Sequence, residues 1–287
     1  MPQTINTNLV SLNAQRNLST SQSALSTSMQ RLSSGLRVNS AKDDAAGLAI
    51  AERMNTQIRG MNVAMRNAND GISMAQVGEG ALGKVADMMQ RMRELAVQAA
   101  NGTNTLTDRV SLNNEYLELS REAARTLGGT QFNGMSILST TQNSTFQIGA
   151  NTDPALDQVS VAAFDWTTLG AITDAVGSAV GADPTVAVAG ADGTFALIAI
   201  AGLDLAIDAI NTQRAAFGAV QNRFENVISN LMVGSENQSA ARSRIMDADY
   251  AAETSNLSRA QILQQAGNAM VAQANQLPQQ VLALLQR

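Results

Sequence analysis

The stretch MNTQIRGMNVAMRNANDGISMAQVGEGALGKVADMMQRMRELAVQAA, residues 54–100, carries the pattern that decides the fold. From Met54 to Met89 apolar residues recur at alternating spacings of three and four, and Glu79 is the only polar side chain on that stripe. A second stripe, made of Val85, Met88, Met92, Leu95 and Ala99, continues on an adjoining face. Such spacing places the side chains on one face of a helix. Asn101-Gly102-Thr103-Asn104 interrupts the pattern. We therefore predict one helix over residues 42–100, roughly 85 Å long at 1.5 Å per residue.

Two further helices are predicted beyond this one. Residues 106–127 carry a second stripe, and Gly128-Gly129 is a typical helix end. Residues 203–233 carry a third, which includes Leu203, Ile210 and Phe224. Three helices of this length favour an elongated bundle.

Both ends of the chain show heptad spacing. The stripe near the start is Leu18, Gln22, Leu25, Met29, Leu32 and Leu36. The stripe near the end is Leu263, Gly267, Met270, Ala274, Leu277, Val281 and Leu284. A stripe of this kind needs a partner helix along its length, so we expect the two to pack against each other and then against other subunits. Pro278 predicts a local kink or a restart of the last helix.

The middle of the chain changes character. Residues 145–148 and 159–161 read as short strands around a turn, which predicts a hairpin. Residues 165–198 are rich in Ala, Gly, Thr and Val and predict a small exposed insert. The predicted fold class is mainly α: a long helical coiled-coil bundle that folds back on itself, with a small β-hairpin region and a short mid-chain insert.

Composition excludes several kinds of function. The 287 residues contain no cysteine and no histidine, which removes disulfides, Cys/His zinc sites and imidazole-based triads. The net charge of −5 argues against nucleic acid and anionic membranes as partners, and no run approaches the roughly 18 apolar residues of a membrane span. The N-terminus lacks the features of a cleavable signal peptide.

Two motifs have simpler explanations than chemistry. Gly78-Glu79-Gly80-Ala81-Leu82-Gly83 matches the dinucleotide-binding string, but it lies inside a helical pattern with no preceding strand. We interpret its glycines as sites of close helix approach. Asp43-Asp44 at a helix start suits the helix dipole better than a metal. We predict no enzyme activity, no cofactor and no metal site.

Several long strings resemble bacterial flagellin, the subunit of the flagellar filament. They include RLSSGLRVNSAKDDAAGLAIAERM from Arg31, RNANDGISMAQVGEGAL from Arg66 and QRMRELAVQAANGTN from Gln90. NTQRAAFGAVQNRFENVISNL from Asn211 and RSRIMDADYAAETSNLSRAQILQQAGNAMVAQANQLPQQVLALL from Arg242 extend the resemblance to the end of the chain. Together the matches cover about residues 1–162 and 200–287.

The resemblance implies three domains. Residues 1–42 with 240–287 would form an inner terminal coiled-coil domain, and residues 43–164 with 199–239 a rod-like helical domain with a β-hairpin. Residues 165–198 would be a short variable surface insert. The apolar residues of the two terminal stripes would mediate filament assembly: Leu18, Leu25, Met29, Leu32, Leu36, Leu263, Met270, Ala274, Leu277, Val281 and Leu284.

The resemblance also implies partners and a location. Copies of the chain would form an extracellular helical filament used for motility. The flagellar type III export apparatus and an export chaperone would secrete it, and hook-junction and cap proteins would border it. The host's flagellin-sensing Toll-like receptor would recognise Gln90, Arg91, Glu94, Leu95 and Glu115. A hook–filament junction protein of the same superfamily is the alternative, and the close match over residues 66–104 argues against it.

Overall fold

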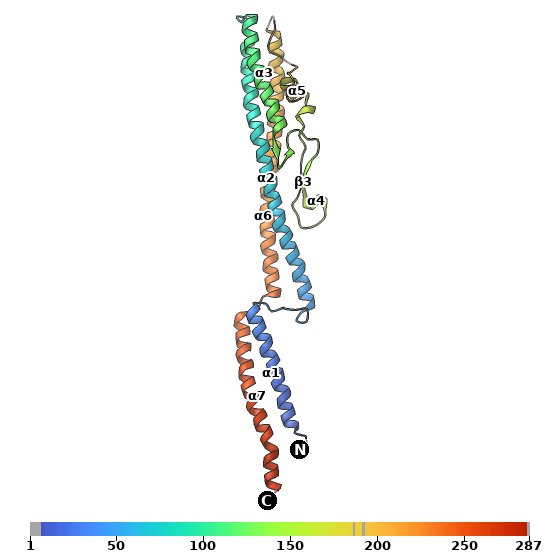
Figure 1. Ribbon diagram of the computed structural model, residues 1–287, viewed down its shortest axis with the longest axis vertical. Coiled ribbons are helices and arrows are strands. Elements are labelled where there is room, and N and C mark those ends of the chain that lie inside the picture. Colours follow the sequence, from blue (N-terminus) through green and yellow to red (C-terminus); the bar gives the residue numbers. More distant parts are fainter. Residues whose placement is uncertain (1–6, 186, 191–192, 286–287) are drawn as a thin grey trace. The chain divides into compact units, whose positions relative to one another are not determined.

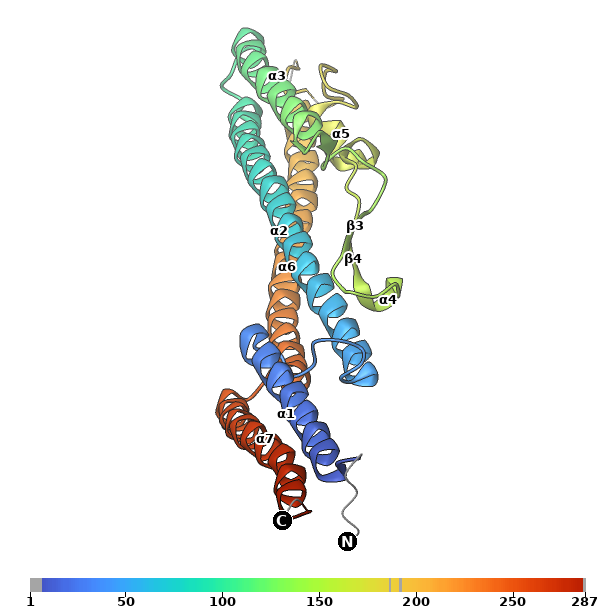
Figure 2. The same cartoon turned by 60° about the horizontal axis from the view of Figure 1, so that its bottom comes forward.

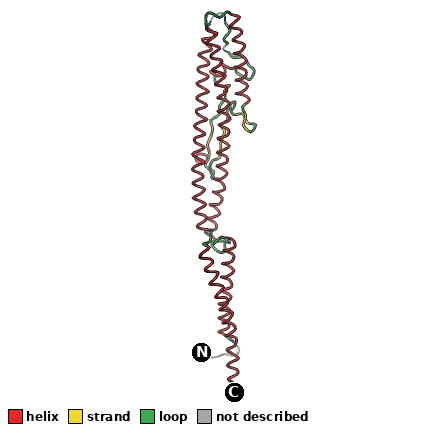
Figure 3. Tube along the Cα trace, turned by 90° about the vertical axis from the view of Figure 1, so that its left-hand side faces the viewer, coloured by secondary structure: helices red, strands yellow, loops and turns green. Residues whose placement is uncertain are grey.

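The fold is mainly α-helical, as the heptad patterns predict. The computed structural model describes residues 7–185, 187–190 and 193–285, with the backbone alone described from residue 277 onward. The helices are α1 (Leu9–Ser34), α2 (Ala45–Ala100), α3 (Leu106–Gly129), α4 (Pro154–Asp157), α5 (Gly170–Val176), α6 (Thr194–Met246) and α7 (Tyr250–Leu285), with a 3-10 turn over Trp166–Thr168. Figures 1 and 3 show how much of the chain these helices occupy.

The chain divides into two compact units. Met1–Gln57 and Glu236–Arg287 make up what we call the terminal unit, and Ile58–Ser235 make up the central unit. Helices α2 and α6 contribute residues to both. The division into three domains implied by the resemblance stays a prediction.

In the central unit, α2, α3 and α6 lie side by side (Figures 1 and 2). The stripes predicted on α2 form its buried face, since Leu82, Met89, Met92 and Leu95 are at most 1% exposed. Packing along this length explains why the helix is stable with few large aromatic residues, because most helical stability in proteins comes from a buried apolar face.

Two glycines of α2 let α6 come close. A Cβ built on Gly71 would lie 2.6 Å from Phe224 Cζ, and one built on Gly78 would lie 2.9 Å from Phe217 Cε2. The two glycines and the two phenylalanines share the same heptad spacing, so each ring fills the space above one missing side chain. Close helix approach is thus confirmed at Gly78, whereas Cβ atoms on Gly80 and Gly83 would meet nothing within 4 Å.

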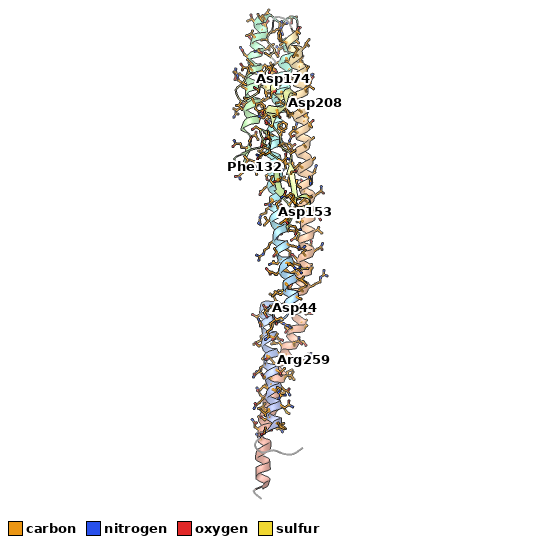
Figure 4. The ribbon with its side chains drawn as sticks, turned by 90° about the vertical axis from the view of Figure 1, so that its right-hand side faces the viewer. Asp44, Phe132, Asp153, Asp174, Asp208 and Arg259 are labelled. Atoms are coloured by element: carbon orange, nitrogen blue, oxygen red, sulfur yellow. The ribbon has the colours of Figure 1, made fainter. Side chains whose placement is uncertain are left out.

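Two antiparallel hairpins follow α3. β3 (Ser144–Gln147) pairs with β4 (Gln158–Val161), with Ser144 opposite Val161, which confirms the predicted hairpin. β1 (Gln131–Phe132) pairs with β2 (Met135–Ser136) in a second hairpin that the sequence analysis did not predict. Its turn residues Asn133 and Gly134 have φ angles of 51° and 78°, as a two-residue type I′ turn requires. Phe132 and Asp153 mark the two hairpins in Figure 4.

Within the described part of residues 165–198, some side chains are buried and others, such as Val180 and Leu197, are exposed, so the predicted insert is only partly exposed. Trp166 is 1% exposed, and Ile172 and Val176 are fully buried in the core of the central unit. Helix α6 begins at Thr194, earlier than predicted, and ends at Met246, later than predicted. The buried face of α6 extends to small residues such as Ala196 and Ala199. The sequence pattern did not indicate this extension because alanines contribute little to an apolar stripe.

Among the described residues, α6 is the one helix long and apolar enough to cross a membrane by length and composition. Its most apolar window has a mean hydropathy of 1.6 and is 28% buried. Asp204 in this helix forms an ion pair with Arg93 of α2 at 2.6 Å, and Leu203 and Ile210 lie in the core. These contacts are those of a helix in a bundle.

Of the two aspartates before α2, Asp44 bonds to the first turn of the helix, as predicted, whereas Asp43 bonds to the preceding loop. Asp44 Oδ1 accepts a hydrogen bond from the backbone N–H of Gly47 at 2.8 Å, and Figure 4 shows Asp44 at this helix end. Asp43 Oδ2 accepts from the backbone N–H of Ser40 at 2.9 Å. Hydrogen bonds from the Ser40 backbone and hydroxyl lower the pKa of Asp43. Helix α2 begins at Ala45 rather than at residue 42, and the Asp44 side chain caps it there.

Candidate interaction surfaces

In the terminal unit, α1 and α7 pack against each other in opposite directions. Asn8 Nδ2, at the start of α1, donates to the carbonyl of Ala274 at 2.7 Å. Tyr250 OH, at the start of α7, donates to the carbonyl of Leu32 at 3.1 Å. The expectation that the two terminal stripes meet is therefore confirmed. Helix α7 continues through Pro278 without the predicted restart, since one proline removes a single backbone donor.

Small and polar residues occupy the centre of the α1–α7 contact. Ser11, Ser28, Ala260 and Ala274 are all at most 6% exposed. Ser11 Oγ donates to Asn275 Oδ1 at 2.7 Å. A two-helix pair held by such residues buries little apolar area, because small side chains bring the helices together without large surfaces to cover.

An ion pair and a glycine also contribute to the α1–α7 contact. Arg31 forms an ion pair with Glu253 at 4.0 Å, and Glu253 is 7% exposed. A Cβ on Gly267 would lie 3.1 Å from Leu18 Cδ1, so the glycine gives room for the leucine. The α1–α7 register is thus set by polar pairs and by one close approach.

Many large apolar side chains of the terminal unit remain exposed. Those that are exposed in the terminal unit are Leu9, Val10, Leu12, Met29, Ile50, Tyr250, Ile262, Leu263 and Met270. Of the predicted assembly residues, Met29, Leu263 and Met270 are 53%, 52% and 59% exposed, and Ala274 is buried. Leu18, Leu25, Leu32 and Leu36 are half-buried. Leu277, Val281 and Leu284 lie where side chains are outside the described part of the chain.

Some of these side chains line a groove beside the α1–α7 contact. Leu9, Val10 and Leu18 line it from α1, and Leu263 and Met270 line it from α7. Asn13, Asn17 and Ser21 add polar atoms at the α1 wall. A groove with this lining suits a helix that presents an apolar edge.

On the central unit, Arg91 of α2 joins two carboxylates. Its Nη1 donates to Glu94 Oε2 at 2.8 Å, and its Nε and Nη2 donate to Glu115 Oε1 of α3 at 3.1 and 2.9 Å. Hydrogen bonding to Glu94 first, and to Glu115 second, raises the pKa of Arg91. The Arg91 side chain is still 51% exposed, so the guanidinium is oriented and accessible at once.

The structure brings four of the five predicted receptor residues to the surface. Gln90, Arg91, Glu94 and Glu115 are exposed. Leu95 is 1% exposed and packs in the core. Leu95 therefore lies beneath this surface, and of the five predicted residues the other four are accessible.

Arg109 is a structural residue that the sequence analysis missed. It is 4% exposed, and its guanidinium donates to the carbonyls of Ala99 at 3.0 Å, Asn101 at 3.3 Å and Gly190 at 3.4 Å. It thereby ties the end of α2 to the segment before α6. The available signal was its position near the start of a predicted helix, where the helix dipole disfavours a cation unless it serves a neighbouring helix end.

The described residues offer no arrangement typical of an active site. Gly78, Gly80 and Gly83 lie within α2, so the dinucleotide-like string has no strand-to-helix loop around it. Within the part of the chain that the structure describes, no group of three acidic, cysteine or histidine side chains could hold a metal ion.

Comparison with known proteins finds matches at both ends of the chain. The bacterial flagellin N-terminal helical region matches residues 5–143, and the bacterial flagellin C-terminal helical region matches residues 200–285. Flagellin of Halalkalibacterium halodurans is 44% identical over 282 residues, covering 98% of this chain and 99% of the relative. Flagellin of Bacillus subtilis strain 168 is 44% identical over 319 residues, covering 98% of this chain and 99% of the relative.

A solved structure, Bacillus cereus flagellin, is 35% identical, with a TM-score of 0.49 over 62% of this chain and 94% of that chain. The shared helical regions span both stretches from which the α1–α7 pair and the α2–α6 pair are built. The chain belongs to the bacterial flagellin family, whose members are structural, extracellular components of the flagellar filament and not enzymes.

Proposed function

We propose that this chain polymerises through its terminal unit into the flagellar filament used for motility. One observation carries the proposal: the α1–α7 pair leaves Leu9, Ile262 and Met270 between 59% and 69% exposed. Large apolar patches on a protein surface mark interaction sites. Here they flank a contact that itself buries mostly small residues, so much of the apolar surface of both helices is left for other copies.

Open-ended assembly follows if the contact is heterologous. When one face of a subunit binds a different face of the next, and the rotation does not close a ring, the product is a helical filament. The resemblance to flagellins supports this geometry. It also supports secretion by the type III export apparatus with an export chaperone, and contacts with hook-junction and cap proteins at the filament ends.

Electron microscopy of the purified chain after salt-induced polymerisation tests this function. We expect long helical filaments from the chain alone. A hook–filament junction protein should instead remain in short assemblies or as monomers under the same conditions. Absence of filaments at high protein concentration would favour that alternative.

A second function is favoured by the Arg91 surface. The guanidinium is held between Glu94 and Glu115 yet remains half exposed, and planar arginine groups fixed in this way are common at binding hot spots. We infer that Gln90, Arg91, Glu94 and Glu115 form a surface bound by the flagellin-sensing Toll-like receptor. Monomeric chain should activate cells that carry the receptor and leave receptor-free cells silent.

A further inference from the structure

The methionines of this chain fall into two environments. The sequence has 13 methionines and no cysteine, so thioethers are its only sulfur groups. Met74, Met89 and Met92 are at most 3% exposed in the central core. Among the residues whose exposure the structure describes, Met29, Met135, Met232 and Met270 are the methionines that are more than half exposed. Only exposed thioethers react readily with oxidants in solution.

Met270 differs from the other exposed methionines in its surroundings. It lies in the apolar groove beside the α1–α7 contact, together with Leu9, Val10, Leu18 and Leu263. Met135 and Met232 have the same exposed fraction, 59%, but belong to the central unit. Exposure to an oxidant is therefore matched at the three sites, while their relation to the proposed subunit contact is not.

We propose that the Met270 thioether is an oxidation site that controls polymerisation of this chain. The inference rests on the proposed function, in which the terminal unit makes the subunit contact. A peroxide in solution is the oxidant. The sulfur lone pair attacks one peroxide oxygen, the O–O bond breaks and an S–O bond forms; hydrogen peroxide is reduced to water as the thioether is oxidised to the sulfoxide.

The consequence for assembly follows from polarity. A thioether adapts to an irregular apolar groove at little cost. A sulfoxide carries a strongly polar S–O bond, and its bound water must be removed when a neighbouring subunit covers the groove. Because Met270 is 59% exposed in the monomer, the monomer itself tolerates the sulfoxide. Oxidation should thus weaken assembly and leave the folded subunit intact.

The test compares polymerisation before and after peroxide treatment of the monomeric full chain. Mass spectrometry of the tryptic peptide from Ala260 to Arg287, in which Met270 is the sole methionine, measures oxidation at this site. We expect the critical concentration of the wild type to rise about five-fold or more, the size expected when one polar group is buried without partners. Helical content by circular dichroism should not change.

Variants locate the effect. Each variant is compared with its own untreated sample. Treated Met270→Leu should polymerise at its untreated critical concentration, whereas treated Met29→Leu, Met135→Leu and Met232→Leu should lose assembly as the wild type does. An unchanged critical concentration in wild-type chain whose Met270 is fully oxidised would overturn the proposal. An equal loss in treated Met270→Leu would overturn it as well.

Protection in the filament provides a second readout. Met270 should oxidise more slowly in assembled filaments than in monomers, and equal rates would overturn the inference even if Met270→Leu fails to assemble. Failure of the untreated wild-type chain to polymerise is a different result, because it contradicts the proposed function and removes the inference with it.

Discussion

Single residues at the surface of the central unit combine exposure with fixed geometry. Arg91 donates to two carboxylates, yet exposed ion pairs of this kind contribute only about 0–1 kcal/mol to stability. Arg91 is therefore free to serve binding without being needed for the fold. Changes at such a residue should separate recognition from folding.

Arg91→Ala should weaken receptor activation by the monomer by about 2 kcal/mol or more, as expected for an interface hot spot. Glu115→Ala should weaken it less, because Glu94 still orients Arg91. A reporter cell assay gives the measurement. Arg125→Ala is the matched control, since Arg125 is also exposed and paired with a carboxylate, Glu122. Equal potency of wild type and a folded Arg91→Ala variant would contradict the receptor proposal.

Asp108 makes the stability of the chain depend on pH. Its carboxylate accepts hydrogen bonds from the Thr105 hydroxyl at 2.7 Å and the Thr105 backbone N–H at 2.9 Å, and these bonds lower the pKa of Asp108. A lowered pKa in the folded state means that the stabilisation is complete above the ordinary aspartate pKa of about 4 and is lost as pH falls through the folded value.

Asp108→Asn should consequently reduce the free energy of unfolding at pH 7 and make the loss of stability below about pH 4 shallower than in the wild type. Urea unfolding of the wild type and of Asp108→Asn, at pH 7 and again below about pH 4, measures the free energy of unfolding of each protein. If the free energy of unfolding fell by the same amount with pH in the two proteins, the Asp108 carboxylate would not contribute to the pH dependence of stability.

At the scale of elements, the packing of α2 on α6 depends on glycines that face phenylalanines. Gly71 and Gly78 admit the rings of Phe224 and Phe217. A glycine inside a helix lowers helix stability by about 1 kcal/mol relative to alanine. At these two positions the close packing of the helices offsets that loss. The structure offers a direct contrast in Gly80, which faces open space.

Gly71→Ala should lower the free energy of unfolding by about 1–3 kcal/mol, because its Cβ would lie 2.6 Å from Phe224 Cζ and the ring would have to move. Gly80→Ala should raise it by about 0.5–1 kcal/mol through helix propensity alone. Chemical denaturation of both variants checks the pair. A stabilised Gly71→Ala variant would show that the ring adjusts freely.

Periodicity made the helices predictable where apolar side chains are large. The apolar stripes over residues 54–99 located α2, and the stripe over residues 106–127 located α3. The extension of α6 over 194–202 escaped prediction because alanines form its buried face. The first hairpin escaped although Asn133-Gly134 is a strong turn signal, since strands of two residues carry no alternation.

Only some of the residues at the candidate interaction surfaces could be predicted from the sequence. Arg91 and Glu115 were identified by resemblance, but their ion pair depends on how the turn at 101–105 sets α3 against α2. The terminal stripes were predicted to meet. Ala274 of the second stripe lies in the contact together with Ser28 and Ala260, which belong to neither stripe, whereas Met270 remains outside. Periodicity identifies a face of a helix but does not determine which partner covers each part of it.

At the scale of the whole molecule, the two units differ in what they bury. The central unit has a large core that includes Tyr116, Trp166, Phe217 and Phe224, all at most 1% exposed. Among the residues whose side chains are described, the small core of the terminal unit contains Val38, Ala51 and Met246. A unit with so little buried apolar surface gains most from association, since burying a Leu or Met side chain contributes about 1.5–3 kcal/mol.

Sedimentation of a chain lacking Leu263–Arg287 tests the assembly role of the terminal unit most directly. The deletion removes the α7 wall of the apolar groove and leaves the core between α2 and α6 untouched. Under conditions in which the full chain pellets as filaments, we predict that the truncated chain stays in the supernatant as a folded monomer, with helical content by circular dichroism reduced only by the deleted segment. Long filaments of the truncated chain in the pellet would contradict the account.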